Sequence, residues 1–242
     1  MNKPESHQKD SAVNLLSNRS FGLYVHWPFC RAKCPYCDFN SHVATSVIPE
    51  ADYVKAVIED LKNDLPWVQG RKLHSIFFGG GTPSLFSGFS IGAILIEAER
   101  LIGFENNIEI TLEANPGVMD QQNFSGLYAA GVNRLSIGIQ SFNDTHLKSL
   151  GRIHGSQDAL SAIDIAQSSG FSNFNIDLMH GLPNQSIANA INDIEIAVSS
   201  GASHISWYQL TIEPNTEFFS RPPLLPADDR LADIQQSGLN II

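Results

Sequence analysis

Cysteine is scarce in this chain of 242 residues, and its three cysteines all fall between Cys30 and Cys37. An odd number of cysteines in so short a window excludes a disulfide framework and points to a metal or redox site. Long apolar runs are also lacking, since no stretch approaches the roughly 20 residues of a membrane-spanning helix. Residues 1–20 are polar and contain no hydrophobic segment of the secretory type, so a cytoplasmic location with reduced thiols is expected.

Positive charge is the second shortage. The chain has 15 lysines and arginines against 25 aspartates and glutamates, a formal net charge of −10. Nucleic-acid backbones and anionic lipids attract clustered basic side chains, so neither is an expected partner. Hydrophobic residues make up 43% of the chain and charged residues 17%, proportions that favour a globular domain over disorder.

From residue 23 onward, β-rich runs alternate with stretches of helical periodicity. The strand candidates cover residues 23–26, 75–78, 108–112, 134–139, 173–178 and 204–210. Apolar side chains recur at helical spacing between them, for example over residues 54–65 and 187–198. Repeated βα units predict an α/β fold with a parallel sheet, either doubly wound and open or curved into a partial barrel.

One main domain is predicted over residues 21–222, because no repeat or linker interrupts this alternation. Residues 1–20 are interpreted as a flexible leader. After Pro222 the chain is rich in proline, and a polar helix is expected from about Asp228. Residues 223–242 are interpreted as the start of a C-terminal region that is truncated within an element.

The cysteines have the spacing C-x3-C-x2-C, as Cys30, Cys34 and Cys37. Thiolates are soft ligands that suit iron–sulfur clusters and zinc. Three of them would leave one iron of a [4Fe–4S] cluster open to a small chelating molecule. A structural zinc ion usually takes four ligands, the fourth of which would be His26 or His42. A redox pair of Cys34 and Cys37 is also possible, but it leaves Cys30 unexplained.

Glycines and polar residues gather where the predicted strands end, the edge at which parallel α/β folds bind ligands. They are Gly79, Gly80, Gly81, Thr82, Glu113, Gln140 and Asp177. The glycines are expected to offer free N–H groups and close approach to a ligand. No Gly-Lys-Ser/Thr follows them, which excludes a phosphate-binding P-loop. A buried Asp177 would need a partner, either a ligand or Arg152.

These motifs resemble those of the radical SAM superfamily, whose members bind a [4Fe–4S] cluster and S-adenosylmethionine (SAM). The family signature is C-x3-C-x2-C with an aromatic residue, here Tyr36, before the third cysteine. Segments 24–30, 79–84, 113–117, 136–142, 150–154 and 177–183 are similar to those of the coproporphyrinogen-oxidase-like branch. The resemblance covers about residues 22–223 and implies a partial (β/α)6 TIM-like barrel with parallel strands.

The resemblance also implies which residues hold the cofactors. The cluster would be held by Cys30, Cys34 and Cys37. SAM would be held by Tyr24, Tyr36, Gly80, Gly81, Thr82, Glu113, Gln140, Arg152 and Asp177. Glu113 would pair with the SAM ammonium and Arg152 with its carboxylate. The implied chemistry is reductive cleavage of SAM, and no catalytic residue beyond the cluster ligands is assigned.

Within that branch, segments 34–42, 151–155 and 206–216 are similar to the haem chaperones. This implies haem binding, a haem-acceptor protein as partner and an electron donor such as a flavodoxin-type reductant. The alternative is an oxygen-independent coproporphyrinogen III oxidase, in which a Gly-Cys pair follows the third cysteine. Asp38 and Phe39 stand in those places here, so that oxidation is not expected. The family's haem-binding segment is expected beyond Ile242.

Overall fold

The computed structural model describes residues 19–45, 47–118 and 120–242. Six strands pair in parallel in one sheet, in the order β1, β4, β5, β6, β7 and β8. The flexible leader expected over residues 1–20 lies almost entirely outside the described residues. Within those ranges, no helix combines the length and apolar character needed to cross a bilayer.

The strands of this sheet confirm all six strand predictions. They are β1 (Gly22–Trp27), β4 (Leu73–Gly80), β5 (Phe104–Ala114), β6 (Arg134–Gln140), β7 (Phe174–His180) and β8 (His204–Gln209). The α-helices are α2 (Glu50–Val68), α3 (Gly88–Leu101), α4 (Gln121–Ala130), α5 (Asp144–Ser149), α6 (Ser156–Ser168), α7 (Ile187–Ser199), α8 (Glu217–Ser220) and α9 (Asp228–Leu239). The helices predicted over residues 54–65 and 187–198 are α2 and α7.

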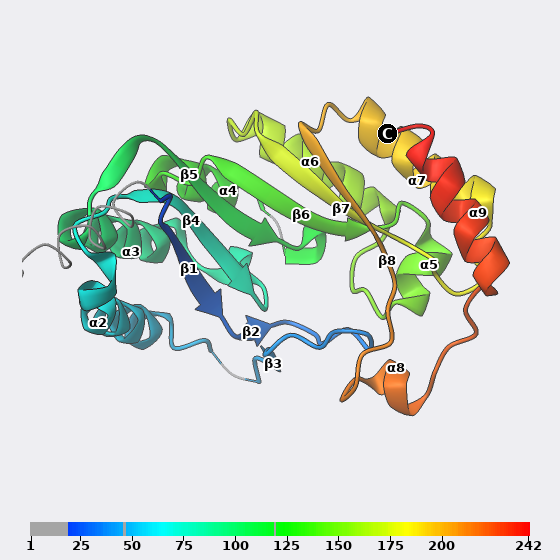
Figure 1. Cartoon of the computed structure of the whole chain (residues 1–242), viewed down its shortest axis with the longest axis horizontal. Helices are drawn as coiled ribbons and strands as arrows, with labels where there is room; N and C mark the ends of the chain where they lie inside the picture. Colours follow the sequence, from blue (N-terminus) through cyan, green and yellow to red (C-terminus); the bar gives the residue numbers. More distant parts are fainter. Residues whose placement is uncertain (1–18, 46, 119) are drawn as a thin grey trace, which may run out of the picture.

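The strand order settles which of the two predicted architectures is right. Strands that follow one another along the chain are also neighbours in the sheet, so the order never reverses. Right-handed crossovers that always advance in one direction place every helix on the same face. Helices α3, α4, α6 and α7 accordingly line one side of the sheet (Figure 1). The fold is a partial barrel of parallel strands, and the doubly wound alternative is wrong.

Side chains alternate across each strand, so the two faces of the sheet differ in polarity. In β6, the fully buried Leu135, Ile137 and Ile139 join the core beneath the helices. The intervening residues of β6, Ser136, Gly138 and Gln140, line the cavity on the concave side. The hydrophobic core is therefore formed between sheet and helices, which leaves the concave face available for polar chemistry.

Helix α9 packs against α7 at one end of the sheet, as Figure 1 shows. It begins at Asp228, where a polar helix was expected, and it ends at Leu239 with Asn240 as its C-terminal cap. The interpretation of residues 223–242 as the start of a truncated C-terminal region stays a prediction. The domain division at residue 222 stays a prediction.

Candidate functional site

The three cysteines lie in the connection between β1 and α2, here called the cysteine loop (residues 28–49). Two short strands, β2 (Phe29–Cys30) and β3 (His42–Val43), pair in parallel at its base. The Cys37 N–H donates to the Cys34 carbonyl at 3.0 Å, which makes a tight turn between these two cysteines. Lys33 closes the far side, because its Nζ donates to the carbonyls of Phe39 and Ser41, each at 3.0 Å.

Gly80, the last residue of β4, and Gly81, which follows it, form the seat on which the cysteine loop rests. A Cβ on Gly81 would lie 2.6 Å from the Phe29 carbonyl oxygen. Gly80 has a φ of +113°, and a Cβ there would lie 2.6 Å from the His26 ring. Only glycine allows so close an approach of backbone to backbone, together with a positive φ.

The expectation that these glycines offer free N–H groups is wrong. The Gly80 N–H donates to Glu113 Oε2 at 3.1 Å. The Gly81 and Thr82 N–H groups donate to the carbonyls of Trp27 and Phe29, at 2.6 and 2.8 Å. The physical reason is that Glu113 occupies the first of these donors, while the end of β1 and the start of the cysteine loop run alongside and accept the other two.

A cavity of about 440 Å³ opens at the carboxyl ends of the strands, beside the cysteines. Its lining includes the three cysteines and eight of the nine predicted SAM contacts: Tyr36, Gly80, Gly81, Thr82, Glu113, Gln140, Arg152 and Asp177. Tyr24 is the exception, since its side chain lies outside that lining on β1 and is 57% exposed. Its hydroxyl bonds His26 Nδ1 at 3.1 Å.

Glu113 and Asp177 are carboxylates of the cavity that lie at the strand side of it, outside the cysteine loop. Neither Glu113 nor Asp177 forms an ion pair with any residue the structure describes. Burial raises the pKa of Glu113 to about 7, and the nearby Asp177 carboxylate acts in the same direction. Burial likewise raises the pKa of Asp177. A site that concentrates uncompensated negative charge fits a cationic ligand, such as a molecule with an ammonium and a sulfonium group.

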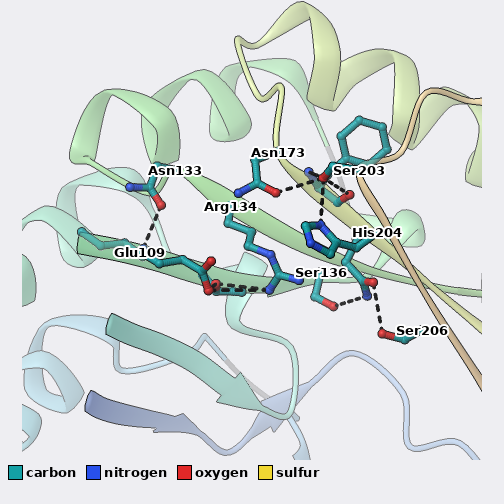
Figure 2. A network of polar contacts seen from close by, with 12 residues as sticks. Glu109, Asn133, Arg134, Ser136, Asn173, Ser203, His204 and Ser206 are labelled. Atoms are coloured by element: carbon teal, nitrogen blue, oxygen red, sulfur yellow. Dashed lines mark hydrogen bonds and ion pairs between the residues drawn. The ribbon is translucent and has the colours of Figure 1, made fainter. Parts of the chain in front are cut away.

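A polar network on the concave face holds the Asp177 carboxylate. Asn175 Nδ2 donates to Asp177 Oδ1 at 2.7 Å, and the Ser136 hydroxyl donates to Oδ2 at 3.1 Å. The Ser206 hydroxyl donates to Asn175 Oδ1 at 3.1 Å, which fixes the amide in turn. Figure 2 shows Ser136 and Ser206 within this network. Asp177 is therefore bonded by neutral neighbours, and the alternative partner that the sequence suggested, Arg152, is not among its hydrogen-bond partners.

Arg152 is buried and connects the strand ends to the cysteine loop. Its Nη2 donates to the Gly138 carbonyl at 2.6 Å, and its Nη1 lies 3.6 Å from Cys34 Sγ and 3.5 Å from the Tyr36 hydroxyl. Its Nε has no partner among the residues described. A buried, unpaired guanidinium donor in a cavity wall fits an anionic group such as the carboxylate of SAM.

Gln140 ends β6 in the left-handed region, with a φ of +71°. Its Oε1 accepts a hydrogen bond from the Tyr208 hydroxyl at 2.7 Å. Tyr208 belongs to the same cavity and was not predicted as a site residue. One feature of the sequence could have indicated it: Tyr208 comes two residues after Ser206, and alternate residues of a strand share one face. Both side chains therefore lie on the concave side of β8.

The thiols fit a cluster better than a single ion. Among the residues described, no group of three His, Cys, Asp or Glu side chains could hold one metal ion. A polynuclear cluster binds each thiolate through a different iron, and the three cysteines share one cavity. His26 is not free to act as a fourth zinc ligand, because its Nδ1 bonds Tyr24 and its Nε2 bonds the Asn40 carbonyl. His26 is therefore a poor candidate for the fourth ligand of a zinc ion.

Two later parts of the chain enclose the cysteine loop. Gly151 has a φ of +65°, and a Cβ there would lie 2.6 Å from Pro35 Cδ. From the other side, the Phe218 N–H of α8 donates to the Pro35 carbonyl at 2.9 Å, and its ring lies 6.4 Å from that of Tyr36. The loop is thus held between the β6–α6 connection and α8.

Comparison with known proteins agrees with this geometry. Curated relatives include "Heme chaperone HemW" of Haemophilus influenzae, 55% identical over 91% of this chain, and that of Escherichia coli, 50% identical over 91%. The chain spans 58% of the length of each of these relatives. Among solved structures, coproporphyrinogen III oxidase (HemN) from Escherichia coli matches with a TM-score of 0.84 and 26% identity. That match covers 96% of this chain and 54% of the other.

A family model agrees with these matches over most of the chain. The model described as "Radical SAM superfamily" matches residues 24–195. That range contains the cysteine loop, the glycine seat and the strand ends that line the cavity. The chain therefore belongs to the radical SAM superfamily.

Proposed function

We propose that the chain is the cluster- and SAM-binding core of a haem chaperone, which transfers haem to an acceptor protein. The observation that carries the cofactor assignment is the single cavity that joins three cysteine thiols to two unpaired carboxylates and a buried arginine. When bound, the [4Fe–4S] cluster supplies the electron for reductive cleavage of SAM. The residues of the chain hold SAM in position and exclude water from it.

Each charged group of the cavity has a distinct task in this proposal. Cys30, Cys34 and Cys37 hold the cluster. Glu113 takes the ammonium of SAM and Arg152 its carboxylate, because the two side chains have opposite charge, Glu113 accepts only from the Gly80 N–H, and Arg152 Nε has no partner among the described residues. Asp177 and Gln140 are placed to bond the hydroxyls of the ribose, since both offer acceptors to the cavity from neighbouring strands. Tyr36 covers the site from the cysteine loop.

The similarity to two HemW haem chaperones, at 55% and 50% identity, supports the haem part of the proposal. The partners are then haem, a haem-acceptor protein and an electron donor such as a flavodoxin-type reductant. The cytoplasm, where thiols stay reduced, is the proposed location. An oxygen-independent coproporphyrinogen III oxidase is the second candidate, favoured by the structural match to HemN.

The cofactor assignment is tested by anaerobic reconstitution of the protein with iron and sulfide. We expect one [4Fe–4S] cluster per chain, with loss of its visible absorption and of its reduced-state EPR signal in Cys30→Ala, Cys34→Ala and Cys37→Ala. SAM should perturb the EPR signal of the reduced wild-type cluster. Stoichiometric zinc without iron in a fully folded protein would contradict the assignment.

The chaperone assignment needs a separate measurement. The full-length protein is loaded with haem and mixed with an apo b-type cytochrome, and transfer is followed by absorption. Transfer that requires the reduced cluster is expected. A protein that binds cluster and SAM but neither binds nor releases haem would keep the cofactor assignment and refute the chaperone role.

A further inference from the structure

A buried carboxylate outside the cavity accepts hydrogen bonds from the two residues that follow Gln140. Asp193 lies on the inner face of α7 and is 1% exposed. Its Oδ2 accepts from the Ser141 hydroxyl at 2.7 Å, and its Oδ1 accepts from the Phe142 N–H at 2.8 Å. The same Ser141 hydroxyl accepts from the Asn143 N–H at 3.1 Å. One side chain of α7 thus organises the loop that follows β6.

That loop begins at Gln140, whose backbone is in an unfavourable conformation. A φ of +71° is uncommon for a residue with a side chain and has to be imposed by its surroundings. The two residues held by Asp193 come immediately after it. The turn at Gln140 directs its side chain to Tyr208, which donates to Gln140 Oε1 at 2.7 Å.

Asp193 has no ion-pair partner in the described ranges. Burial raises its pKa, while the bonds from Ser141 and Phe142 and the nearby His146 act in the opposite direction. A leucine at this position would suit the inner face of α7, which otherwise consists of alanine and isoleucine. A carboxylate is therefore not required for packing, and what it does contact is the loop after Gln140.

We propose that Asp193 is a positioning residue of the SAM site: by holding Ser141 and Phe142, it fixes the left-handed turn at Gln140 and so the place of the Gln140 amide. The inference rests on the proposed SAM site. It makes the outer helix α7 part of the machinery that shapes the cavity, although Asp193 does not line it.

The test compares Asp193→Leu with Asp193→Asn in reconstituted protein, with SAM affinity measured by anaerobic calorimetry. Leucine removes both acceptors. We expect it to weaken SAM binding at least about tenfold, equivalent to about 1.4 kcal/mol, while the cluster is retained. Asparagine should keep most of the affinity, because its Oδ1 accepts from the Phe142 N–H and its amide donates to Ser141. Ser141→Ala, which loses one bond, is a milder second variant and should fall between wild type and Asp193→Leu.

Asn133→Ala is the matched control for a purely structural effect. Asn133, which directly precedes β6, accepts from the Ile110 N–H through its Oδ1 and donates to the Ile108 carbonyl through its Nδ2, each at 2.8 Å (Figure 2). Its loss should lower stability without changing SAM affinity.

Two results would overturn the inference. One is equal SAM affinity in wild type, Asp193→Leu and Ser141→Ala. The other is an equal loss of affinity in Asn133→Ala, which would show that affinity follows stability alone. A wild-type chain that binds the cluster but no SAM would refute the proposed SAM site itself, and this inference with it.

Discussion

At Glu113, the proposed binding of SAM and the stability of the fold favour different forms of the side chain. The ionised carboxylate would bind the ammonium of SAM, whereas the neutral form is less costly to bury. Its pKa is raised from 4.5 to about 7 because the side chain is buried. The folded state therefore holds its proton to higher pH than the unfolded state. The corresponding stability is present below about pH 4.5 and is lost as pH rises through about 7.

Glu113→Gln removes the ionised form and keeps an oxygen for the Gly80 N–H. At pH 8, without SAM, we expect a free energy of unfolding higher than that of wild type by up to about 3 kcal/mol. The difference should vanish below about pH 4.5, and SAM affinity should fall sharply. Chemical unfolding across pH and calorimetry measure the two effects. The exposed Glu99→Gln serves as control, and a Glu113→Gln variant that is less stable at pH 8 would contradict the prediction.

The sequence predicted which residues gather at the cavity better than it predicted the contacts that each of them makes. The spacing of the cysteines predicts a metal or redox site. The polar residues Glu113, Gln140 and Asp177 are singled out because each occurs in or after an apolar run that predicts a strand. The sequence does not show which backbone donors are already occupied, so the role assigned to the glycine N–H groups was wrong. Nor does it reveal Asp193, because one acidic residue in an amphipathic helix is normally expected on the solvated side.

At the scale of elements, the cysteine loop depends on contacts made far away in the chain. Of these contacts, the one between Gly151 and Pro35 leaves almost no room for a side chain. Gly151→Ala would place a Cβ 2.6 Å from Pro35 Cδ, on top of the cost of a positive φ for a side-chain-bearing residue. We expect this variant to fold but to bind markedly less iron and sulfide after reconstitution.

Gly201→Ala is the matched control, because it carries only the free-energy cost of a positive φ. Gly201 has a comparable φ of +79°, and a Cβ there would contact only Gln167 Nε2, at 3.6 Å. Both variants should lose about 1–2 kcal/mol of stability from the backbone, but only Gly151→Ala should lose iron. Equal iron content in the two proteins would rule out the proposed clamp on Pro35.

The spacing of apolar residues predicted the long strands and helices, but it did not predict the short elements. Long strands such as β6 and β7 combine apolar alternation with clear boundaries, so they were predicted. The two-residue strands β2 and β3 and the single-turn helix α8 carry too few residues for a period to register. They exist because of tertiary contacts around the cysteine loop, such as the bond from the Phe218 N–H to the Pro35 carbonyl.

For the whole molecule, the main functional question is which reaction the barrel supports. Asp38 and Phe39 line the cavity beside the cysteines, and Phe39 is 55% exposed. A carboxylate and a large ring at that point change the shape and charge offered to an acidic porphyrinogen. We expect the full-length protein, incubated anaerobically with SAM, reductant and coproporphyrinogen III, to form no protoporphyrinogen IX. Multiple turnovers detected by chromatography would instead support the oxidase.

The overall fold could be narrowed to two architectures from the sequence, and the choice between them came from strand order. Periodicity shows that strands and helices alternate, but it says nothing about which side of the sheet the next strand joins. The resemblance to radical SAM proteins implied a partial barrel, and the unreversed order from β1 to β8 confirms it.

This strand order also has a consequence for how the protein is made. A ribosome releases the chain in the order in which the sheet is built, so each new strand can add to the edge of those already folded. Gly80 and Gly81, which form the seat of the cysteine loop, are synthesised soon after the three cysteines. The segments that close over the loop, at Gly151 and Phe218, are synthesised much later. We therefore expect the thiols of the nascent chain to stay accessible to iron and sulfide until the segments at Gly151 and Phe218 have been made.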